Sequence, residues 1–429
     1  MEEKNIFISI YGDPSNWHKV NYNINNNSYS SITSSSAICK EYKIKKSIIL
    51  IPDTLYPHIF QPGNTSFTEY SERIKEEFRK HIFQKIEAES DQITKSFICQ
   101  SELVVFPSLG TFPHNSGLYA FKNDIWVLYY HIYRSLLTKF KEIDNFDTIY
   151  VDLTYGINFL EFIFSKSLKY ALYSLSVHKR KDYFINYLNS DPFNIKVKSL
   201  NIENIGTDSI YHKNSLPTLA NEFLSEYKNY EELLAKNFSK LNYLKSTAIM
   251  IQNGTIPYLI HIISKINNQF NVFTNLNREV IVTSENGISN ITGDTNNPLS
   301  HTDLIFTAYI DAITCFYKDI QKKELSTIML YDVIDNYFGQ NPINILLKNE
   351  LKNIKKMKMT DTFQDVGKYR SDKFSDEKTF KRNFFAHAGL INGLVFIKKY
   401  QNNIILEFRD KFNLGDSTKD IDWIVDNII

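Results

Sequence analysis

The sequence is short of cysteine and has no excess of either charge, and each shortage excludes a class of protein. Its 429 residues include three cysteines, Cys39, Cys99 and Cys315, which lie far apart and form no CxxC pair. This spacing excludes a disulfide framework and a zinc–cysteine cluster, so we expect a reducing compartment. Lys and Arg total 49 against 48 Asp and Glu, a net charge of +1. No global positive field marks a nucleic-acid binder, so a polyanion would need a local site.

Long apolar runs are also missing. No stretch of about 18 apolar residues occurs, and the apolar segment 159–177 is interrupted by Glu161, Lys166 and Lys169. The N-terminal MEEKNIFISIYGDPSNW has no basic segment followed by an apolar core, which argues against a signal peptide. We therefore expect a cytoplasmic protein that has no membrane partner.

The remaining composition is that of folded domains, with 43% hydrophobic and 23% charged residues. A chain of this length is too long for one ordinary core and suggests two or three domains. We predict an α/β domain over 1–201, a mainly helical linker or insertion over 202–300, and an all-α domain over 301–429.

The first 200 residues alternate short apolar runs with longer amphipathic ones. Strands rich in Ile, Val, Phe and Tyr are predicted at 5–12, 46–53, 102–110, 147–156 and 193–201. Helical patterns lie between them at 66–94, 117–141 and 158–177. This alternation predicts a Rossmann-like, parallel-rich sheet with helices on both faces. The Asn- and Ser-rich segment 21–37 favours a hairpin turn followed by a Ser-capped helix, with a disordered loop as the alternative.

Four of the predicted strands end in polar turns that contain Gly or Pro. These turns are 12–17 (GDPSNW), 52–54 (PDT), 107–111 (PSLGT) and 152–158 (DLTYGIN). Ligands of open α/β sheets bind at the carboxyl ends of strands, where backbone N–H groups face anions. Trp17 and Tyr155 add aromatic faces for bases. Together the turns predict a nucleotide pocket, although each turn alone is better explained by capping and packing.

The region after residue 301 predicts helices at 302–321, 324–338, 342–358 and 376–398, with a short hairpin of 393–400 and 403–410 at the end. The stretch KRNFFAHAGL (381–390) carries Arg382, Asn383 and His387. On a helix Asn383 and His387 share one face, and Arg382 lies about 140° around the axis from His387. A long Arg side chain could reach the same cleft, especially if a second subunit closes it.

These three side chains suit RNA cleavage without a metal ion. Histidine changes charge near neutral pH and can move a proton to or from a reacting oxygen. Arginine stabilises negative charge on the transferring phosphate, and asparagine can orient either the histidine or a phosphate oxygen. The sequence has no HExxH, no clustered carboxylates and no Cys/His ligand set. The alternative is a surface arginine beside a hydrogen-bonded core histidine.

The two groups of motifs together resemble the CRISPR type III ancillary ribonucleases, which join a CARF sensor domain to a HEPN effector domain. RNFFAHAGL resembles the RNxxAHxGL form of the HEPN R-x4-6-H signature, and DLTYGIN resembles the DxTHGxN element of the CARF domain. GDPSNWHKVNY (12–22) and SSSAIC followed by KSIILIPDTL resemble the family's first strand turn and second strand. Tyr155 stands where the family usually has His, and it could stack on adenine or hydrogen-bond through its hydroxyl.

The resemblance implies an endoribonuclease activated by a cyclic oligoadenylate, often cyclic tetra-adenylate, which binds across two CARF domains of a dimer. A composite HEPN site at the dimer interface then cleaves single-stranded RNA without a metal or other cofactor, in a homodimer or a larger assembly of dimers. Arg382, Asn383 and His387 would be catalytic. The ligand pocket would comprise Gly12, Asp13, Ser15, Asn16, Trp17, Thr54, Ser108, Gly110, Thr111, Asp152, Thr154, Tyr155, Gly156 and Asn158.

Two other functions are compatible with parts of the sequence. A nucleotide-sensing transcriptional regulator would bind DNA through 202–300, but no helix-turn-helix with a basic recognition helix occurs there. An unregulated HEPN toxin would use the N-terminal domain only as a dimerisation scaffold, and such a scaffold needs no polar turns at its strand ends. The basic runs 178–181 and 352–358 are candidate RNA contacts, with a solvated helix face as the more ordinary explanation.

Overall fold

The computed structural model divides the chain into two compact units. It describes residues 4–56, 63–114, 117–155, 159–192, 197–234, 241–266, 279–285, 288–294, 304–321, 324–339, 342–369, 376–401, 403–414 and 417–427. The first unit comprises Met1–Leu172, Asp182–Ile210 and Asn275–Leu304, and the second comprises Tyr173–Lys181, Tyr211–Thr274 and Ile305–Ile429. The chain thus forms two units rather than three consecutive segments, and the predicted insertion 202–300 contributes to both.

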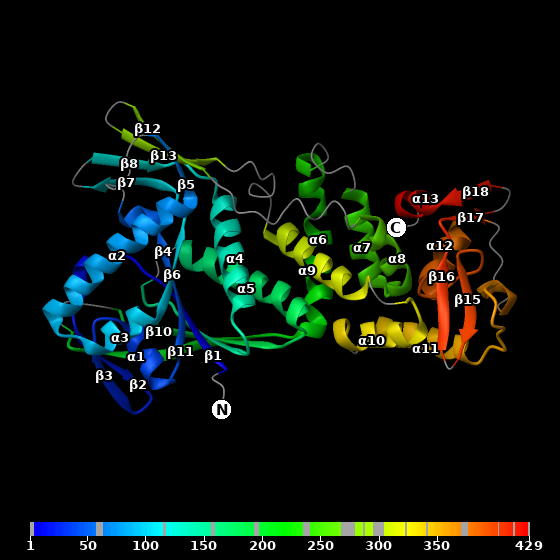
Figure 1. Ribbon diagram of the computed structural model, residues 1–429, viewed down its shortest axis with the longest axis horizontal. Helices are drawn as coiled ribbons and strands as arrows, with labels where there is room; N and C mark the ends of the chain where they lie inside the picture. The colour runs from blue at the N-terminus through cyan, green and yellow to red at the C-terminus, as the bar shows by residue number, and fades with distance from the viewer. Residues whose placement is uncertain are drawn as a thin grey trace. The chain divides into compact units, whose positions relative to one another are not determined.

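An eight-stranded sheet forms the centre of the first unit, in the order β3-β2-β11-β10-β9-β1-β4-β6 (Figure 1). Its strands are β1 (Asn5–Ile10), β2 (Val20–Ile24), β3 (Asn27–Ser31), β4 (Lys46–Pro52), β6 (Ser101–Phe106), β9 (Thr148–Asp152), β10 (Tyr183–Ser190) and β11 (Ser199–Ile210). β6, β4, β1, β9 and β10 run parallel, while β11 is antiparallel to β10. Four of the predicted strands are confirmed. The fifth, 193–201, lies partly outside the described residues, and its described end begins β11.

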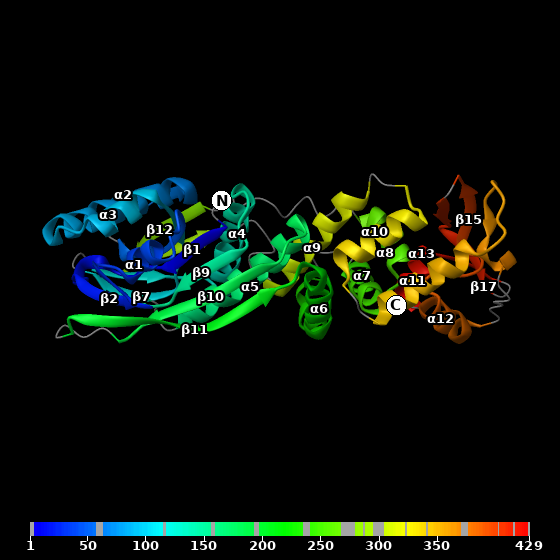
Figure 2. The same ribbon diagram turned by 90° about the horizontal axis from the view of Figure 1, so that it is seen from below.

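Both faces of this sheet are covered by helices, as the apolar strand sequences predict. Phe7, Ile49 and Val105 pack on one face in a core shared with residues of α1 (Ser34–Glu41), α2 (Phe67–Glu89) and α3 (Gln92–Gln100). α4 (Ile125–Glu142) and α5 (Phe159–Lys179) lie on the other face (Figures 1 and 2). The predicted α/β arrangement is therefore confirmed, and the predicted hairpin at 21–37 is the β2–β3 pair.

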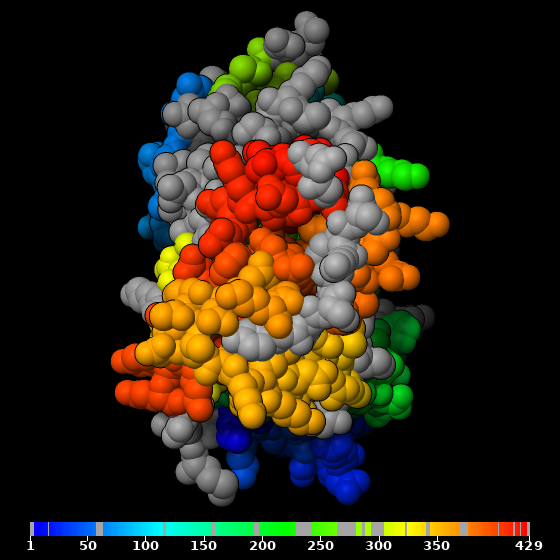
Figure 3. All heavy atoms as spheres, turned by 90° about the vertical axis from the view of Figure 1, so that its right-hand side faces the viewer, coloured from blue at the N-terminus to red at the C-terminus, as the bar shows by residue number. Residues whose placement is uncertain are grey.

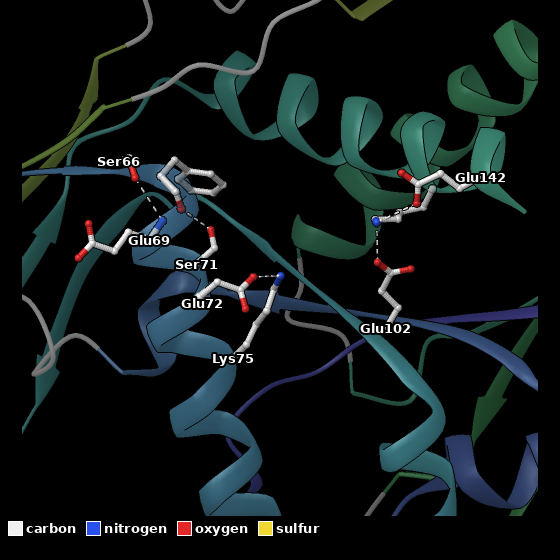
Figure 4. Close-up of polar contacts among 9 residues, drawn as sticks. Ser66, Glu69, Ser71, Glu72, Lys75, Glu102 and Glu142 are labelled. Carbon is white, nitrogen blue, oxygen red and sulfur yellow. Dashed lines mark hydrogen bonds and ion pairs between the residues drawn. The ribbon is translucent and has the colours of Figure 1, made fainter.

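Capping residues set the helix boundaries that periodicity alone misplaced. Ser66 caps α2 by accepting a hydrogen bond from the Glu69 N–H at 3.3 Å (Figure 4). The predicted helix 66–94 is interrupted because Ser90 adopts a left-handed conformation and Asp91 caps a new helix, α3. The predicted helix 117–141 begins late, since 117–121 is a strand and Asp124 caps α4. Lys139 of α4 pairs with Glu102 of β6 at 2.6 Å, which ties this helix to the sheet.

A second sheet in the first unit joins strands from three distant parts of the chain. Its order is β5-β12-β13-β8-β7. The strands are β5 (Gly63–Ser66), β7 (Gly110–His114), β8 (Gly117–Phe121), β12 (Glu279–Glu285) and β13 (Ile288–Asp294). The sequence did not predict this sheet. The β7–β8 and β12–β13 pairs are local hairpins, but the β5–β12 and β8–β13 pairings join segments more than 150 residues apart in the chain and depend on tertiary contacts.

Helices form most of the second unit. They are α6 (His212–Leu234), α7 (Leu241–Asn253), α8 (Ile256–Ile266), α9 (Leu304–Ile320), α10 (Thr327–Tyr337), α11 (Pro342–Lys355), α12 (Glu377–Ala386) and α13 (Ile421–Asn427). Phe223 of α6 stacks on Tyr309 of α9 with ring centroids 4.8 Å apart, and Thr247 of α7 shares a 2.7 Å hydrogen bond with the Tyr309 hydroxyl. In the part of the chain that the structure describes, none of the helices has the length and hydropathy needed to cross a membrane.

Strands also occur in the second unit, so the prediction of an all-α C-terminal domain is wrong. They are β14 (Gln364–Asp365), β15 (Val395–Tyr400), β16 (Asn403–Phe408), β17 (Lys411–Leu414) and β18 (Ser417–Asp420). β15 and β16 are antiparallel, which confirms the predicted hairpin. Figure 3 shows the orange and red residues of these C-terminal strands at the surface of the unit.

The predicted helix 376–398 ends early, at Ala386. Ala388 and Gly389 have φ of 53° and 79°, a left-handed pair that a continuing helix cannot contain. The N–H of Gly389 donates to the carbonyl of Phe384 at 2.7 Å, and that of Ala388 donates to Phe385 at 3.2 Å. These two bonds form a Schellman motif, which satisfies the last carbonyls of α12 and turns the chain toward β15.

Candidate functional site

The turns that follow β1, β9 and β10 surround a cavity of about 420 Å³ in the first unit. Because these strands are parallel, their carboxyl ends meet at one edge of the sheet. The cavity is lined by Asp13, Trp17, His18, Tyr22, Ile32, Leu153, Thr154, Tyr155, Glu161, Asn189, Ser190, Asp191, Pro192 and Leu200. Two of the four polar turns identified in the sequence, 12–17 and 152–158, therefore contribute to one cavity.

Trp17 and Tyr155 form an aromatic wall of this cavity. Their ring centroids lie 4.7 Å apart, and Tyr11 packs edge-on against both rings. The Tyr155 hydroxyl accepts a hydrogen bond from the Ser34 N–H at 3.0 Å and lies 3.1 Å from the Tyr22 hydroxyl. Burial raises the pKa of the Tyr155 hydroxyl to about 12. Since the hydroxyl is occupied by these contacts, the geometry favours stacking over hydrogen bonding as the way Tyr155 would contact a base.

Asp152 supports the cavity from behind and does not line it. The residue is 1% exposed, and its carboxylate accepts hydrogen bonds from the hydroxyls of Ser34 at 2.7 Å and Ser35 at 2.6 Å. It also accepts from the Thr154 N–H at 3.0 Å, which fixes the turn after β9. Burial raises the pKa of Asp152, and these hydrogen bonds oppose the rise. Asp152 thus holds the turn of Tyr155 against the N-terminus of α1.

The other predicted pocket residues occupy different places. Asp13 lines the cavity and caps the short 3-10 helix η1 (Pro14–Asn16), accepting from the Ser15 N–H at 2.9 Å. Besides Asp152, six predicted residues lie outside the cavity lining: Gly12, Ser15 of η1, Thr54 of the 3-10 helix η2 (Asp53–Leu55), buried Ser108, and Gly110 and Thr111 of β7. Gly156, Asn158 and the side chain of Asn16 lie outside the described residues.

The cavity carries more acceptors than cations. Asp13, Glu161 and Asp191 contribute carboxylates, and His18 is the one basic side chain in the described lining. Burial raises the pKa of the Glu161 carboxyl. Carboxylate and amide oxygens accept hydrogen bonds from the exocyclic amine of adenine, whereas phosphates require donors. This end of the sheet therefore suits the base of a nucleotide better than its phosphates.

Sequence reasoning missed the residues that come from β10 and its turn. Asn189, Ser190 and Asp191 line the cavity because β10 lies beside β9 in the parallel part of the sheet. The sequence placed a strand at 193–201 instead. The available signal was the start of an alternation in YFINYLNS (183–190), where Tyr183 and Ile185 are buried. A register shift between Tyr187 and Leu188 interrupts the alternation before buried Leu188.

A second group of candidate residues lies at the end of α12 in the second unit. Arg382 and Asn383 lie in its C-terminal half, and His387 is its C-cap residue. The His387 N–H donates to the Asn383 carbonyl at 3.0 Å, so the expected i, i+4 relation survives at the helix end. The Arg382 side chain is exposed and its Nε lies 3.4 Å from Oδ1 of Asn383. Arg382 and Asn383 are therefore in contact, with His387 one turn beyond.

A carboxylate that the sequence did not suggest faces this histidine. Oε2 of Glu350, on α11, lies 3.4 Å from Nδ1 of His387. Glu350 is 8% exposed, and it lies on the same side of α11 as buried Leu347 and Ile354. An acidic residue at a buried position of an amphipathic helix is the signal that could have revealed it.

The chemistry available here is proton transfer beside a fixed positive charge. His387 can exchange a proton, Arg382 can stabilise an anion, and Glu350 can orient the imidazole ring. Among the residues that the structure describes, no group of three His, Cys, Asp or Glu side chains is arranged to hold a metal ion.

Comparison with protein-family models gives a match for each of the two sites. The model for the CARF domain of the CRISPR system endoribonuclease Csx1 matches residues 6–192, and the model for its HEPN domain matches residues 340–410. The fold and the two matches define a CARF–HEPN ribonuclease. The first range contains every lining residue of the cavity except Leu200, and the second contains Glu350 and the Arg382–His387 segment. The chain belongs to the Csx1-type endoribonucleases of type III CRISPR defence.

Whole-chain comparisons give relatives of the same type. The CRISPR system endoribonuclease Csx1 of Methanocaldococcus jannaschii is 24% identical over 444 residues, covering 95% of this chain and 90% of that protein. The solved structure of Enterococcus italicus Csm6 bound to cyclic hexa-2'-fluoro-hexa-dAMP is similar over 90% of this chain and 93% of that one. Its sequence identity to this chain is 9% and its TM-score is 0.25.

Proposed function

We propose that the chain is a metal-independent endoribonuclease that cleaves single-stranded RNA when a cyclic oligoadenylate binds its CARF domain. Cyclic tetra-adenylate is the activator that we expect. One observation carries the proposal. A single chain holds an aromatic, acceptor-lined cavity at the carboxyl ends of parallel strands and an Arg–Asn–His group in a HEPN-matched segment. Neither an unregulated nuclease nor a DNA-binding regulator accounts for both features.

The cavity suits an adenine base in particular. The Trp17 and Tyr155 rings offer a stacking surface, which is worth about 1–3 kcal/mol per base in single-stranded nucleic-acid sites. Asp13, Glu161 and Asp191 can accept hydrogen bonds from the adenine amine. The phosphates of the ring would then be met by backbone N–H groups at the strand ends and by a second CARF domain.

Cleavage requires two proton transfers. The ribose 2′-hydroxyl loses its proton as its oxygen attacks phosphorus, and the departing 5′-oxygen gains a proton as the P–O5′ bond breaks. The products are a 2′,3′-cyclic phosphate and a 5′-hydroxyl. Each chain supplies one His387 and one Arg382 in the matched HEPN segment. A dimer with a composite site would bring two histidines, one to accept and one to donate a proton, and two arginines for the phosphate charge.

Glu350 would act through His387 in this scheme. Its carboxylate lies on the Nδ1 side of the ring. This leaves Nε2 for the RNA oxygen and stabilises the imidazolium that forms when His387 takes a proton.

The test is an RNA cleavage assay in EDTA with purified full-length protein and labelled single-stranded RNA. Cyclic tetra-adenylate, cyclic hexa-adenylate and no ligand are compared, for wild type and His387→Ala. The proposal expects cleavage that depends on one of the ligands and is lost in His387→Ala. Cleavage without any ligand would identify an unregulated nuclease, and no cleavage with either ring would contradict the proposal.

A further inference from the structure

A second polar cavity, distinct from the Arg382–His387 group, opens in the second unit. Its volume is about 580 Å³. Residues from β14 to β18 and from the turn after α12 line it: Asp365, Asn392, Gly393, Phe396, Arg409, Lys411, Phe412, Asn413 and Thr418. Nothing in the scheme above gives this cavity a role.

The cavity carries two cations and one carboxylate that is already bound. Asp365 accepts hydrogen bonds from the Gly367 N–H at 2.8 Å and from the Gly393 N–H at 3.0 and 3.1 Å. Among the described residues, neither Arg409 nor Lys411 has a carboxylate within ion-pair distance. The positive charge of both side chains is therefore available to a ligand.

Neighbouring acids are engaged elsewhere. Asp410, between the two cations in sequence, lies 3.1 Å from Nε2 of His261. Asp420 lies opposite Lys411 in the β17–β18 ladder, and its side chain accepts from the Trp423 N–H at 3.0 Å to begin α13. Both acids thus have roles of their own next to the cavity.

Packing against an aromatic ring holds the Arg409 guanidinium in a position that suits anion binding. Its Cζ lies 3.7 Å from the centroid of the Phe396 ring, which places the guanidinium on the face of that ring. A guanidinium held this way keeps its in-plane N–H donors free for phosphate oxygens. Asn392, Asn413 and Thr418 add polar groups to the same lining. Cations beside aromatic and amide side chains are typical of single-stranded nucleic-acid sites.

We propose that this cavity binds the backbone phosphates of the single-stranded RNA substrate, with Arg409 and Lys411 as the phosphate contacts. The inference rests on the proposed function, because RNA is the polyanion on which the enzyme acts. The cavity lining from Asp365 to Arg409 falls in the HEPN-matched range, Lys411 lies one residue beyond it, and Asn392 follows His387 by five residues in the chain. RNA held there would extend the grip on the substrate beyond the cleaved bond.

Binding of an RNA that cannot be cleaved tests this directly. Full-length protein is titrated into fluorescently labelled single-stranded 2′-O-methyl RNA, which lacks the attacking hydroxyl, and anisotropy is followed at several salt concentrations. Arg409→Gln/Lys411→Gln is compared with wild type and with Lys399→Gln. Lys399 is a matched control because it is exposed, lies on β15 and is absent from the cavity lining.

The expected change follows from counterion release. Each lost phosphate contact on a single strand lowers the slope of log K against log salt by about 0.7, so the double variant should lose about 1.4. At about 0.15 M salt the same relation gives about a 14-fold weaker Kd. Lys399→Gln should bind as wild type does. If the double variant proves unfolded by circular dichroism, Lys411→Gln is tested alone. Its slope of log K against log salt should be smaller in magnitude than that of wild type by about 0.7.

An unchanged slope in the double variant, or an equal loss in Lys399→Gln, would overturn the inference. If the double variant binds RNA as wild type does but no longer binds a protein that wild type binds, the cavity would belong to that protein partner, and the inference would also be overturned. This binding assay needs neither activator nor chemistry. A protein that binds 2′-O-methyl RNA through Arg409 and Lys411 but never cleaves RNA would contradict the proposed function and leave the inference standing.

Discussion

Replacing Glu350 with alanine should slow RNA cleavage without weakening RNA binding. The carboxylate lies 3.4 Å from Nδ1 of His387 and is shielded from solvent, at 10% side-chain exposure against 28% for the histidine. It faces the ring nitrogen opposite the one that would meet the RNA. Its expected contribution is therefore made when His387 becomes charged, which is during the reaction.

The size of the effect follows from the distance between the two groups. Two unit charges 3.4 Å apart attract by about 1.2 kcal/mol in water and by about 5 kcal/mol at an effective dielectric constant of about 20. The lower figure corresponds to about an eightfold rate change. General acid–base catalysis contributes about 10²- to 10⁴-fold in total, which sets the ceiling. We expect kcat of Glu350→Ala to fall about 10- to 1,000-fold, with KM for RNA unchanged.

The assay is single-turnover cleavage of a fluorogenic RNA at saturating activator, for wild type, Glu350→Ala, Glu350→Gln, His387→Ala and the Glu350→Ala/His387→Ala pair. Glu350→Gln keeps an acceptor oxygen and should be intermediate. Because Glu350 acts through His387, removing both should cost no more than removing His387. An additive double variant, or a rise in KM in place of the fall in kcat, would refute this reasoning.

Two further predictions concern the first unit. Trp17→Ala should raise the activator concentration for half-maximal cleavage by about 5- to 150-fold, the equivalent of about 1–3 kcal/mol of stacking, and leave the maximal rate intact. A titration with cyclic tetra-adenylate measures both quantities. Abolished cleavage at saturating ligand would show that Trp17 does more than contact the ligand. Burial raises the pKa of Asp152 in the folded state above its value in the unfolded state. As the pH rises from the unfolded-state pKa toward the folded-state pKa, wild type therefore loses stability, whereas Asp152→Asn has no carboxyl to ionise and does not. The stability advantage of wild type over Asp152→Asn, from urea unfolding midpoints, should therefore narrow as the pH rises above about 4, the ordinary pKa of an aspartate, and a gap that widens would mean that burial is not the dominant cause.

Local sequence determined the central sheet and the outline of both sites. Strands such as KSIILIPD and DTIYVDLTYG are short apolar runs that end in turn residues, and a parallel sheet with both faces buried needs such runs. Their order in the chain placed polar turns at one edge. The RNFFAHAGL and DLTYGIN motifs are equally local, so the resemblance to CARF–HEPN ribonucleases can be recognised from the sequence without any tertiary contact.

Only the tertiary structure decided which of those residues meet. Thr54 follows β4 as expected but lies outside the cavity lining. Ser108, Gly110 and Thr111 also lie outside it, since the chain after β6 enters a second sheet. Asp152 has the expected place and a supporting role, because the hydroxyls of Ser34 and Ser35 reach it from α1. These outcomes depend on pairings between distant segments, which local propensity does not encode.

The end of α12 shows both contributions in one motif. The sequence determined that Arg382, Asn383 and His387 are close along the chain, and the backbone bond from His387 to Asn383 keeps that relation. Packing then decided where the helix stops, since the left-handed pair Ala388–Gly389 turns the chain into β15. Packing also brought Glu350 of α11 to His387, a contact between residues 37 positions apart that no local pattern specifies.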